Sequence, residues 1–99
     1  MSRRLIVRPE AEAEMAEAFA WYENRVSGLG SEYLFCVDAV FNLILRTPQH
    51  FPHVHRTVRR ALTRRFPYEV FYVEDDERVV ILSVFHTRRN PKRWQERIR

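Results

Sequence analysis

Two stretches near the end of the chain decide the fold, FPYEVFYV at Phe66–Val73 and RVVILSVF at Arg78–Phe85. Both are rich in aromatic and β-branched residues, which favour β-strands. The four charged residues between them, at 74–77, are typical of a hairpin connection. Just upstream, Thr57–Thr63 predicts a further strand. The second half of the chain is therefore expected to form an antiparallel sheet.

Two amphipathic helices are expected in the first half. One runs from Pro9 to about Arg25 and the other from near Ser31, a predicted N-cap, to Pro48, where proline ends the helix. Apolar residues in both recur at helical spacing. They are Ala11, Met15, Phe19, Tyr22 and Val26 in the first helix, and Leu34, Val37, Phe41 and Ile44 in the second. The short glycine-containing segment between them predicts an antiparallel helical hairpin that lies on the sheet.

The complete order of elements predicts an α+β fold. Leu5–Val7 is expected to be a short first strand, and residues 48–56 a loop, because two prolines lie there. The order β-α-α-β-β-β predicts a helical hairpin packed on a small, mainly antiparallel sheet. A length of 99 residues suits a single domain over residues 1–99.

The cysteine, histidine and apolar content limits the kind of protein. Cys36 is alone and cannot form an internal disulfide, and no apolar run approaches the roughly 20 residues of a membrane span. No signal peptide is recognisable, so we expect a cytoplasmic protein that does not associate with a membrane. His50, His53 and His55 have no nearby carboxylate or thiolate, so no metal and no cofactor are predicted.

Charge is distributed unevenly along the chain. Residues 10–38 contain acids and a single base, Arg25, whereas residues 46–65 and 86–99 are strongly basic. All but one of the 17 basic residues are arginine, whose planar guanidinium binds phosphate and carboxylate groups in a bidentate manner. A nucleic acid or an acidic protein segment is the partner that this pattern favours.

Six short motifs are spread over nearly the whole chain. They are VRPEA at Val7–Ala11, AWYE at Ala20–Glu23, GLG at Gly28–Gly30, VRRAL at Val58–Leu62, FPY at Phe66–Tyr68 and HTRRNP at His86–Pro91. Their order and spacing resemble the RelE/ParE superfamily, the toxins of bacterial type II toxin–antitoxin pairs. The resemblance implies a cognate antitoxin that wraps around the toxin, and operator DNA as a partner only through that complex. RelE-like members cleave mRNA on the ribosome, whereas ParE-like members inhibit DNA gyrase.

Most of the residues that RelE itself uses to cleave RNA are replaced in this chain. RNA cleavage without a metal needs a base, an acid and cations on the phosphate. Aligned on Tyr68, the RelE lysine positions fall on Arg60 and Leu62, and its middle-strand arginine falls on Glu69. The C-terminal tyrosine could only be replaced by Trp94, which has no ionisable proton. The chain therefore resembles the ParE-like members more closely.

A different set of nuclease residues remains open, with Glu69 as base, His86 as acid and Arg60 or Arg65 on the phosphate. If the hairpin closes over residues 74–77, Glu69 faces Leu82 and Arg65 faces His86. Alternation of side chains then places Glu69, Arg65 and His86 on one face of the sheet, with Glu69 and His86 about 13 Å apart along the strands.

The leading hypothesis is a ParE-like toxin that inhibits growth by binding DNA gyrase, without chemistry of its own. Its expected target-binding residues are Arg59, Arg60, Arg88, Arg89, Arg93 and Trp94. The alternatives are a ribosome-dependent mRNA endonuclease and an inactive toxin homologue that acts only in an antitoxin–operator complex. Trp21 and Tyr22 are adjacent on a helix, so one of them is expected at an exposed edge, where the pair would receive the antitoxin.

Overall fold

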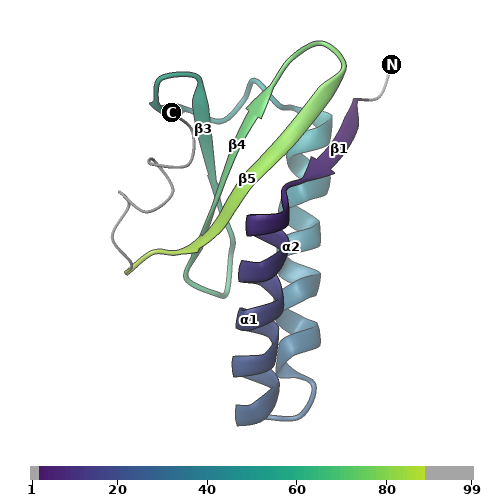
Figure 1. Ribbon diagram of the computed structural model, residues 1–99, viewed down its shortest axis with the longest axis vertical. Helices are drawn as coiled ribbons and strands as arrows, with labels where there is room; N and C mark the ends of the chain where they lie inside the picture. The colour runs from purple at the N-terminus through teal and green to yellow at the C-terminus, as the bar shows by residue number, and fades with distance from the viewer. Residues whose placement is uncertain (1–2, 89–99) are drawn as a thin grey trace.

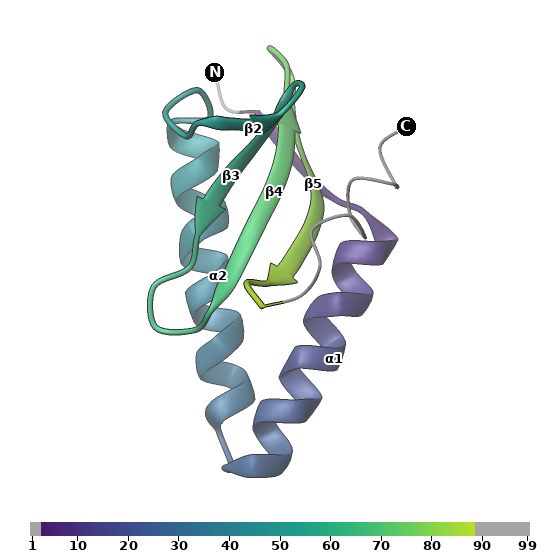
Figure 2. The ribbon, with the colours of Figure 1, turned by 90° about the vertical axis from the view of Figure 1, so that its left-hand side faces the viewer.

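A helical hairpin lies against one face of a five-stranded sheet in the computed structural model, which describes residues 3–88 (Figure 1, Figure 2). The helices are α1 (Pro9–Arg25) and α2 (Leu29–Arg46). The strands are β1 (Arg4–Val7), β2 (His53–His55), β3 (Val58–Leu62), β4 (Tyr68–Glu74) and β5 (Arg78–His86), in the spatial order β1-β5-β4-β3-β2. Only β1 and β5 pair in parallel. The predicted α+β fold with a mainly antiparallel sheet is confirmed.

The main core lies between the hairpin and the sheet. Along α2, the predicted stripe is buried at Val37, Phe41 and Ile44, and Leu34 packs against them. The sheet contributes Val70, Tyr72, Val79, Ile81 and Val84, and α1 contributes Ala11 and Ala18. Val26, expected on the buried stripe of the first helix, is 59% exposed, because α1 ends at Arg25 and the backbone of Val26 is already extended.

The turn between the helices depends on two glycines and one carboxylate. α2 begins at Leu29 rather than near Ser31, because Glu23 of α1 accepts hydrogen bonds from the amides of Gly28 (2.8 Å) and Gly30 (2.9 Å). A carboxylate in this position satisfies amides that have no partner within the helix. Gly28 has a φ of 89°, which favours glycine. At Gly30 a Cβ atom would lie 2.7 Å from Phe19, so only glycine allows the two helices to approach this closely.

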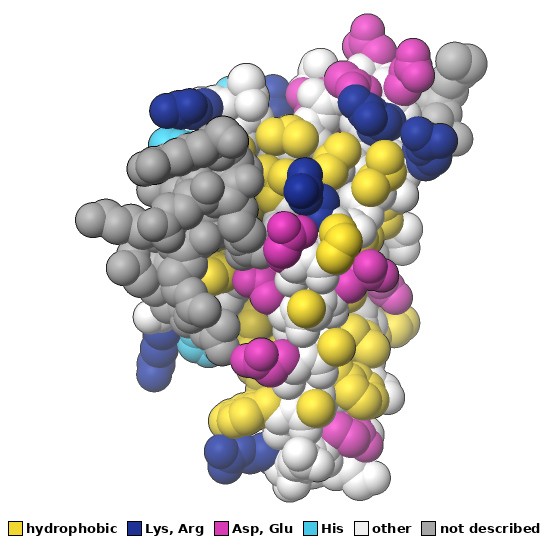
Figure 3. All heavy atoms as spheres, in the orientation of Figure 1, with side chains coloured by type: hydrophobic (Ala, Val, Ile, Leu, Met, Phe, Trp, Pro, Cys, Tyr) yellow, Lys and Arg dark blue, Asp and Glu magenta, His cyan; other side chains and the backbone are white. Residues whose placement is uncertain are grey.

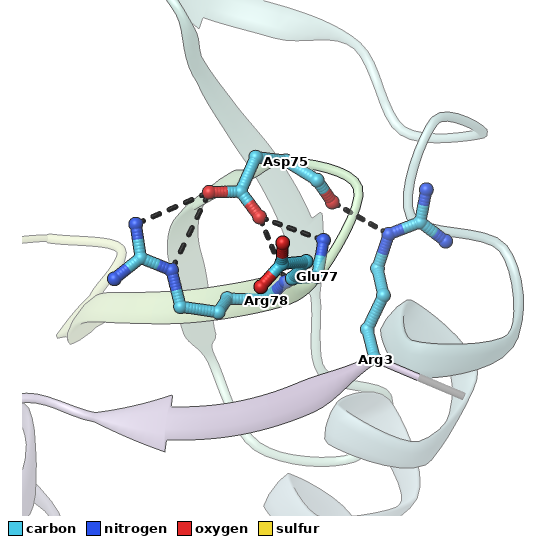
Figure 4. A network of polar contacts seen from close by, with 4 residues as sticks. All are labelled: Arg3, Asp75, Glu77 and Arg78. Atoms are coloured by element: carbon cyan, nitrogen blue, oxygen red, sulfur yellow. Dashed lines mark hydrogen bonds and ion pairs between the residues drawn. The ribbon is translucent and has the colours of Figure 1, made fainter. Parts of the chain in front are cut away.

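The tip of the β4–β5 hairpin is fixed by Asp75 (Figure 4). Its Oδ1 accepts hydrogen bonds from the amides of Glu77 and Arg78, both at 2.8 Å, and the hydrogen bond from Glu77 is the main cause of its lowered pKa. Arg3 Nε donates to the Asp75 carbonyl at 2.7 Å and so holds the segment before β1 against the tip. The last hydrogen bond of the hairpin therefore joins the Asp75 amide to the Arg78 carbonyl. The turn is tighter than the predicted connection over 74–77.

The pairing of β4 with β5 differs from the predicted register. Glu74 pairs with Val79 because of the tight tip, and an irregularity beyond Ile81 inserts Leu82 as one extra residue in β5. Glu69 consequently pairs with Phe85 instead of Leu82. The register has shifted by three residues. A shift by an odd number of residues moves a side chain to the other face of the sheet relative to its expected partners.

The sheet has an apolar cluster on the face away from the helices as well. Val58, Phe71 and Phe85 are buried there, with Val73 and Leu82 packed around them. The edge strand β2, which pairs with β3, lies within the segment predicted as a loop, so that prediction was wrong. Neither helix of the described region 3–88 is long and apolar enough to span a bilayer.

Candidate functional site

A hollow of about 550 Å³ lies between α1 and the last residues of β5. It exists because β1 pairs only with the first part of β5, as far as Ile81, and leaves the rest of that edge beside α1. Its lining combines acidic and aromatic side chains: Glu14, Glu17, Ala18, Trp21, Tyr22, Asn24, Tyr68, Val84, Phe85 and His86. We call this hollow the α1 groove. Figure 3 shows that acidic side chains lie among hydrophobic ones over the helical hairpin on this side of the molecule.

Glu14 connects α1 to the uncovered edge of β5. Its carboxylate accepts hydrogen bonds from the hydroxyl of buried Ser83 (2.8 Å) and the amide of Val84 (3.1 Å). A backbone amide without a strand partner is costly to bury, and a carboxylate is a strong acceptor for it. Glu14 thus supplies the hydrogen-bond acceptor for the edge of β5 beyond the point where the parallel pairing with β1 ends.

An aromatic cluster forms the floor of the α1 groove and continues into the core. Trp21 is 53% exposed and contacts Tyr22 edge to face, with the ring centroids 5.0 Å apart. Tyr22 is half-buried and stacks on Tyr33, and Tyr68 contacts both Tyr33 and His86 at about 5 Å between centroids. The expectation that one residue of the Trp21–Tyr22 pair lies at an exposed edge is confirmed.

Two tyrosines of the core have raised pKa values. Burial raises the pKa of Tyr33 well above its usual range, with smaller contributions from Tyr68, Tyr22 and Glu14. The Tyr33 hydroxyl has no hydrogen-bond partner among the described residues. Burial also raises the pKa of Tyr72 to about 12, and its hydroxyl donates to the Pro48 carbonyl at 2.6 Å. Both phenols are therefore structural groups that stay protonated at neutral pH.

The predicted register placed Glu69 and His86 on the same face of the sheet. The structure places them on opposite faces. Glu69 lies opposite Phe85 on the face away from the helices, whereas His86 lies opposite Tyr68 on the helix side. Glu69 forms an ion pair with Arg60, at 3.2 Å between Oε1 and Nη1. Arg65 instead pairs with Glu32 of α2. The four residues of the nuclease hypothesis thus fall into three separate places.

The two adjacent arginines of β3 differ sharply in accessibility. The side chain of Arg59 is 14% exposed; its Nη1 donates to the Phe51 carbonyl at 2.6 Å, and its Nε lies 3.5 Å from Glu74. Arg59 therefore fastens the segment before β2 to the sheet. Arg60 projects from the opposite face with a side chain that is 39% exposed, which leaves part of its guanidinium open to a partner.

The basic C-terminal corner begins at Arg88, the last residue that the structure describes. Arg88 is exposed, and its amide donates to Nδ1 of His86 at 3.1 Å. The other predicted contact residues there, Arg89, Arg93 and Trp94, lie outside residues 3–88. His50, His53 and His55 belong to no cluster of three or more ligand-type residues within the described part of the chain.

Comparison with known proteins places these features in one family. The family model described as the ParE toxin of the type II toxin–antitoxin system parDE matches residues 5–91. The chain belongs to the ParE toxin family. This membership implies a cognate antitoxin as its partner.

Relatives agree with the assignment. Toxin ParE2 of Mycobacterium tuberculosis, in two strains, is 35% identical over 92 residues, which cover 92% of this chain and 88% of the relative. A solved structure described as a chromosomal ParDE toxin–antitoxin system from P. aeruginosa superposes with a TM-score of 0.76 at 12% identity, covering 85% of this chain and 95% of the other. At that identity, the likeness shows the fold alone.

Two carboxylates of this ParE chain were not predicted to have tertiary roles. A carboxylate near the start of a helix, such as Glu14, is ordinarily explained by its interaction with the helix dipole. The available signal was position, because Glu14 lies three residues after Ala11 and four before Ala18, on the buried stripe of α1. Glu23 had no such signal, since its role depends on the amides of the following helix.

Proposed function

We propose that this ParE-family toxin inhibits growth by binding DNA gyrase and not by cleaving RNA. One observation carries the choice between the two: Glu69 and His86 lie on opposite faces of the sheet, so they are poorly arranged to act on one ribose. The ion pair with Arg60 further supports a structural role for Glu69, because a general base must be available to the proton that it removes.

The proposed target surface begins on the face of the sheet away from the helices and continues into the C-terminal corner. Arg60 and Arg88 are its accessible cations among residues 3–88. Arg89, Arg93 and Trp94 complete it, since arginine and tryptophan are the residues most often responsible for binding energy at interfaces. We assign Arg59 the supporting role of holding β3 in place, because its guanidinium is already bound by the chain itself.

The α1 groove is the proposed antitoxin site. Its exposed Trp21 offers a large apolar surface, and Tyr22 extends that surface into the core. Glu14 and Glu17 line the same hollow and would favour an antitoxin segment that carries apolar residues together with a basic one. The antitoxin would then cover α1, whereas Arg60 lies on the other face of the sheet.

Toxicity of four induced chains tests the proposal. Glu69→Gln and His86→Ala should remain toxic, because neither removes an arginine of the target surface. Truncation after Arg89 should abolish toxicity. Circular dichroism and thermal unfolding of each variant serve as the folding control.

The opposite result would be loss of toxicity in Glu69→Gln or His86→Ala and retention of toxicity on truncation. It would indicate ribosome-dependent mRNA cleavage instead of gyrase binding. A native chain that is not toxic at all would indicate a homologue that acts only in the antitoxin–operator complex.

A further inference from the structure

The outward face of α2 exposes large apolar side chains that the α1 groove does not use. Phe35 is 76% exposed, the highest value among the large hydrophobic residues of the described chain, and Leu43 is 40% exposed. Ala39 lies exposed between them on the same helix. The residues that α2 buries against the sheet, among them Val37, Phe41 and Ile44, point to the opposite side. An exposed phenylalanine beside a leucine on a regular helix is a typical feature of a contact surface.

The residues on this face are arranged symmetrically about Ala39. Phe35 and Leu43 lie four positions before and after Ala39, and Glu32 and Arg46 lie seven positions before and after it. With 3.6 residues per turn, all four side chains fall within about 40° of the direction of Ala39. The face is therefore apolar near its centre, acidic at one end and basic at the other.

Such an arrangement is complementary to itself when one copy is reversed. If two α2 helices cross antiparallel at Ala39, Phe35 of one copy meets Leu43 of the other, and Glu32 meets Arg46. Each of these contacts occurs twice about the two-fold axis, as in an isologous dimer. The small side chain of Ala39 at the crossing point allows the helices to approach closely.

The charges that flank the contact are compatible with this pairing. Glu32 already pairs with Arg65 of its own chain, but its side chain is 51% exposed, and a carboxylate can accept from two guanidinium groups. Asp38, which is exposed, lies about 100° from Ala39 around the helix and so falls outside the contact. No charge of the face would therefore be buried without a partner of opposite sign.

We propose that the outward face of α2, formed by Glu32, Phe35, Ala39, Leu43 and Arg46, is a dimerisation surface for a second copy of this chain. The second copy is favoured over a different protein because this one face supplies both members of every apolar and ionic pair. One helix from each copy makes a small interface, so the dimer forms in a concentration-dependent manner. The α1 groove remains separate from this contact.

Sedimentation of the free chain, made by cell-free synthesis, over a range of concentrations tests the proposal. The native chain should shift from monomer to dimer as its concentration rises. Phe35→Glu should raise the dimer dissociation constant about tenfold or more, because it places a charge at the centre of the contact. Leu62→Glu is the matched control, since Leu62 is 56% exposed on β3, and it should leave the constant unchanged.

A charge-reversal series separates dimerisation from a merely structural role of the same residues. Glu32→Arg and Arg46→Glu should each weaken the dimer, and the double variant should restore it, because the pair is re-formed between the copies. Arg65→Ala removes the ion pair within the chain and should leave dimerisation unchanged. A native chain that stays monomeric at every concentration would overturn the proposal. So would a Phe35→Glu variant that dimerises normally but binds the antitoxin weakly, because the face would then belong to the antitoxin.

Discussion

Glu69 and His86 lie near each other in the β4–β5 ladder but on opposite faces of the sheet, because Glu69 pairs with Phe85 and His86 pairs with Tyr68. The carboxylate is held by Arg60, while the imidazole contacts an aromatic ring of the core side. The arrangement separates the two groups that a Glu/His nuclease would need to combine. This separation supports the proposal that the toxin acts by binding and not by cleaving RNA.

Substitution of Glu14 by alanine should destabilise the fold. The amide of Val84 and the hydroxyl of Ser83 would both lose their acceptor, and an unsatisfied polar group in a buried position costs about 1–3 kcal/mol. Urea unfolding of Glu14→Ala checks this expectation. Glu12→Ala is the control, because Glu12 is exposed on the same helix and its loss should change the free energy of unfolding by less than about 0.5 kcal/mol. Equal stability of the two variants would contradict the role of Glu14.

Alanine at the two glycines of the helix turn should act through different mechanisms. Gly30→Ala forces the helices apart, because the new Cβ meets both the ring and the carbonyl of Phe19, and overpacking of this kind costs about 1–3 kcal/mol. Gly28→Ala meets no atom but adopts a left-handed backbone conformation, at about 1–2 kcal/mol.

Asparagine, which tolerates left-handed geometry, separates the two cases. Gly28→Asn should recover part of the stability lost in Gly28→Ala, whereas Gly30→Asn should remain as damaged as Gly30→Ala. Thermal unfolding of the four variants provides the comparison, and equal recovery at both positions would refute the steric account of Gly30.

Removal of the two buried phenol hydroxyls should have different effects on stability. Tyr72→Phe loses the hydrogen bond to Pro48 and should cost about 1 kcal/mol. Tyr33→Phe removes a buried hydroxyl that has no partner in the described structure, and should be neutral or stabilising. Denaturant midpoints of the two variants measure the contrast. A Tyr33→Phe chain that is less stable than Tyr72→Phe would contradict it.

The raised pKa values of the same two tyrosines predict a loss of folding stability at alkaline pH. Their pKa values are raised in the folded chain, so between the ordinary value of 10.0 and the value of about 12 for Tyr72 the folded state binds more protons than the unfolded state. Stability contributed by this difference is complete below pH 10 and is lost as the pH rises toward 12. The double variant Tyr33→Phe, Tyr72→Phe should show a flatter decline in unfolding free energy over this window. An unchanged decline would mean that other groups cause it.

Antitoxin binding should protect Trp21 from solvent. Trp21 is 53% exposed, and in a Trp94→Phe background its fluorescence reports on the α1 groove alone. A soluble quencher should reach it in the free toxin and be excluded in the complex. Trp21→Ala should weaken antitoxin binding, with Val26→Ala, another exposed apolar residue of the hairpin, as the control. Equal quenching with and without the antitoxin would remove the groove from the interface.

Local sequence patterns predict the elements of this fold better than the contacts between them. The spacing of Val37, Phe41 and Ile44 identifies the buried face of α2, because helix periodicity is a local property. The register of β5 was predicted wrongly, since it depends on the turn that Asp75 builds and on the extra residue at Leu82. Neither feature leaves a pattern in the alternation of side chains.

The candidate site shows the same division. Exposure at the Trp21–Tyr22 pair follows from the positions of two adjacent bulky residues on a helix, and it was predicted. The roles of Glu14, Glu23 and Arg59 depend on groups elsewhere in the fold that they reach, which sequence spacing does not specify. The α1 groove itself results from the short reach of β1 along β5, a tertiary property.

The most direct test of the account is a short induction of this toxin in bacteria without its antitoxin, with mRNA ends mapped by primer extension and DNA damage followed by the SOS response. Gyrase binding predicts an SOS response with intact mRNA. New mRNA cuts at codon spacing without DNA damage would contradict it, and would assign the toxicity to cleavage on the ribosome.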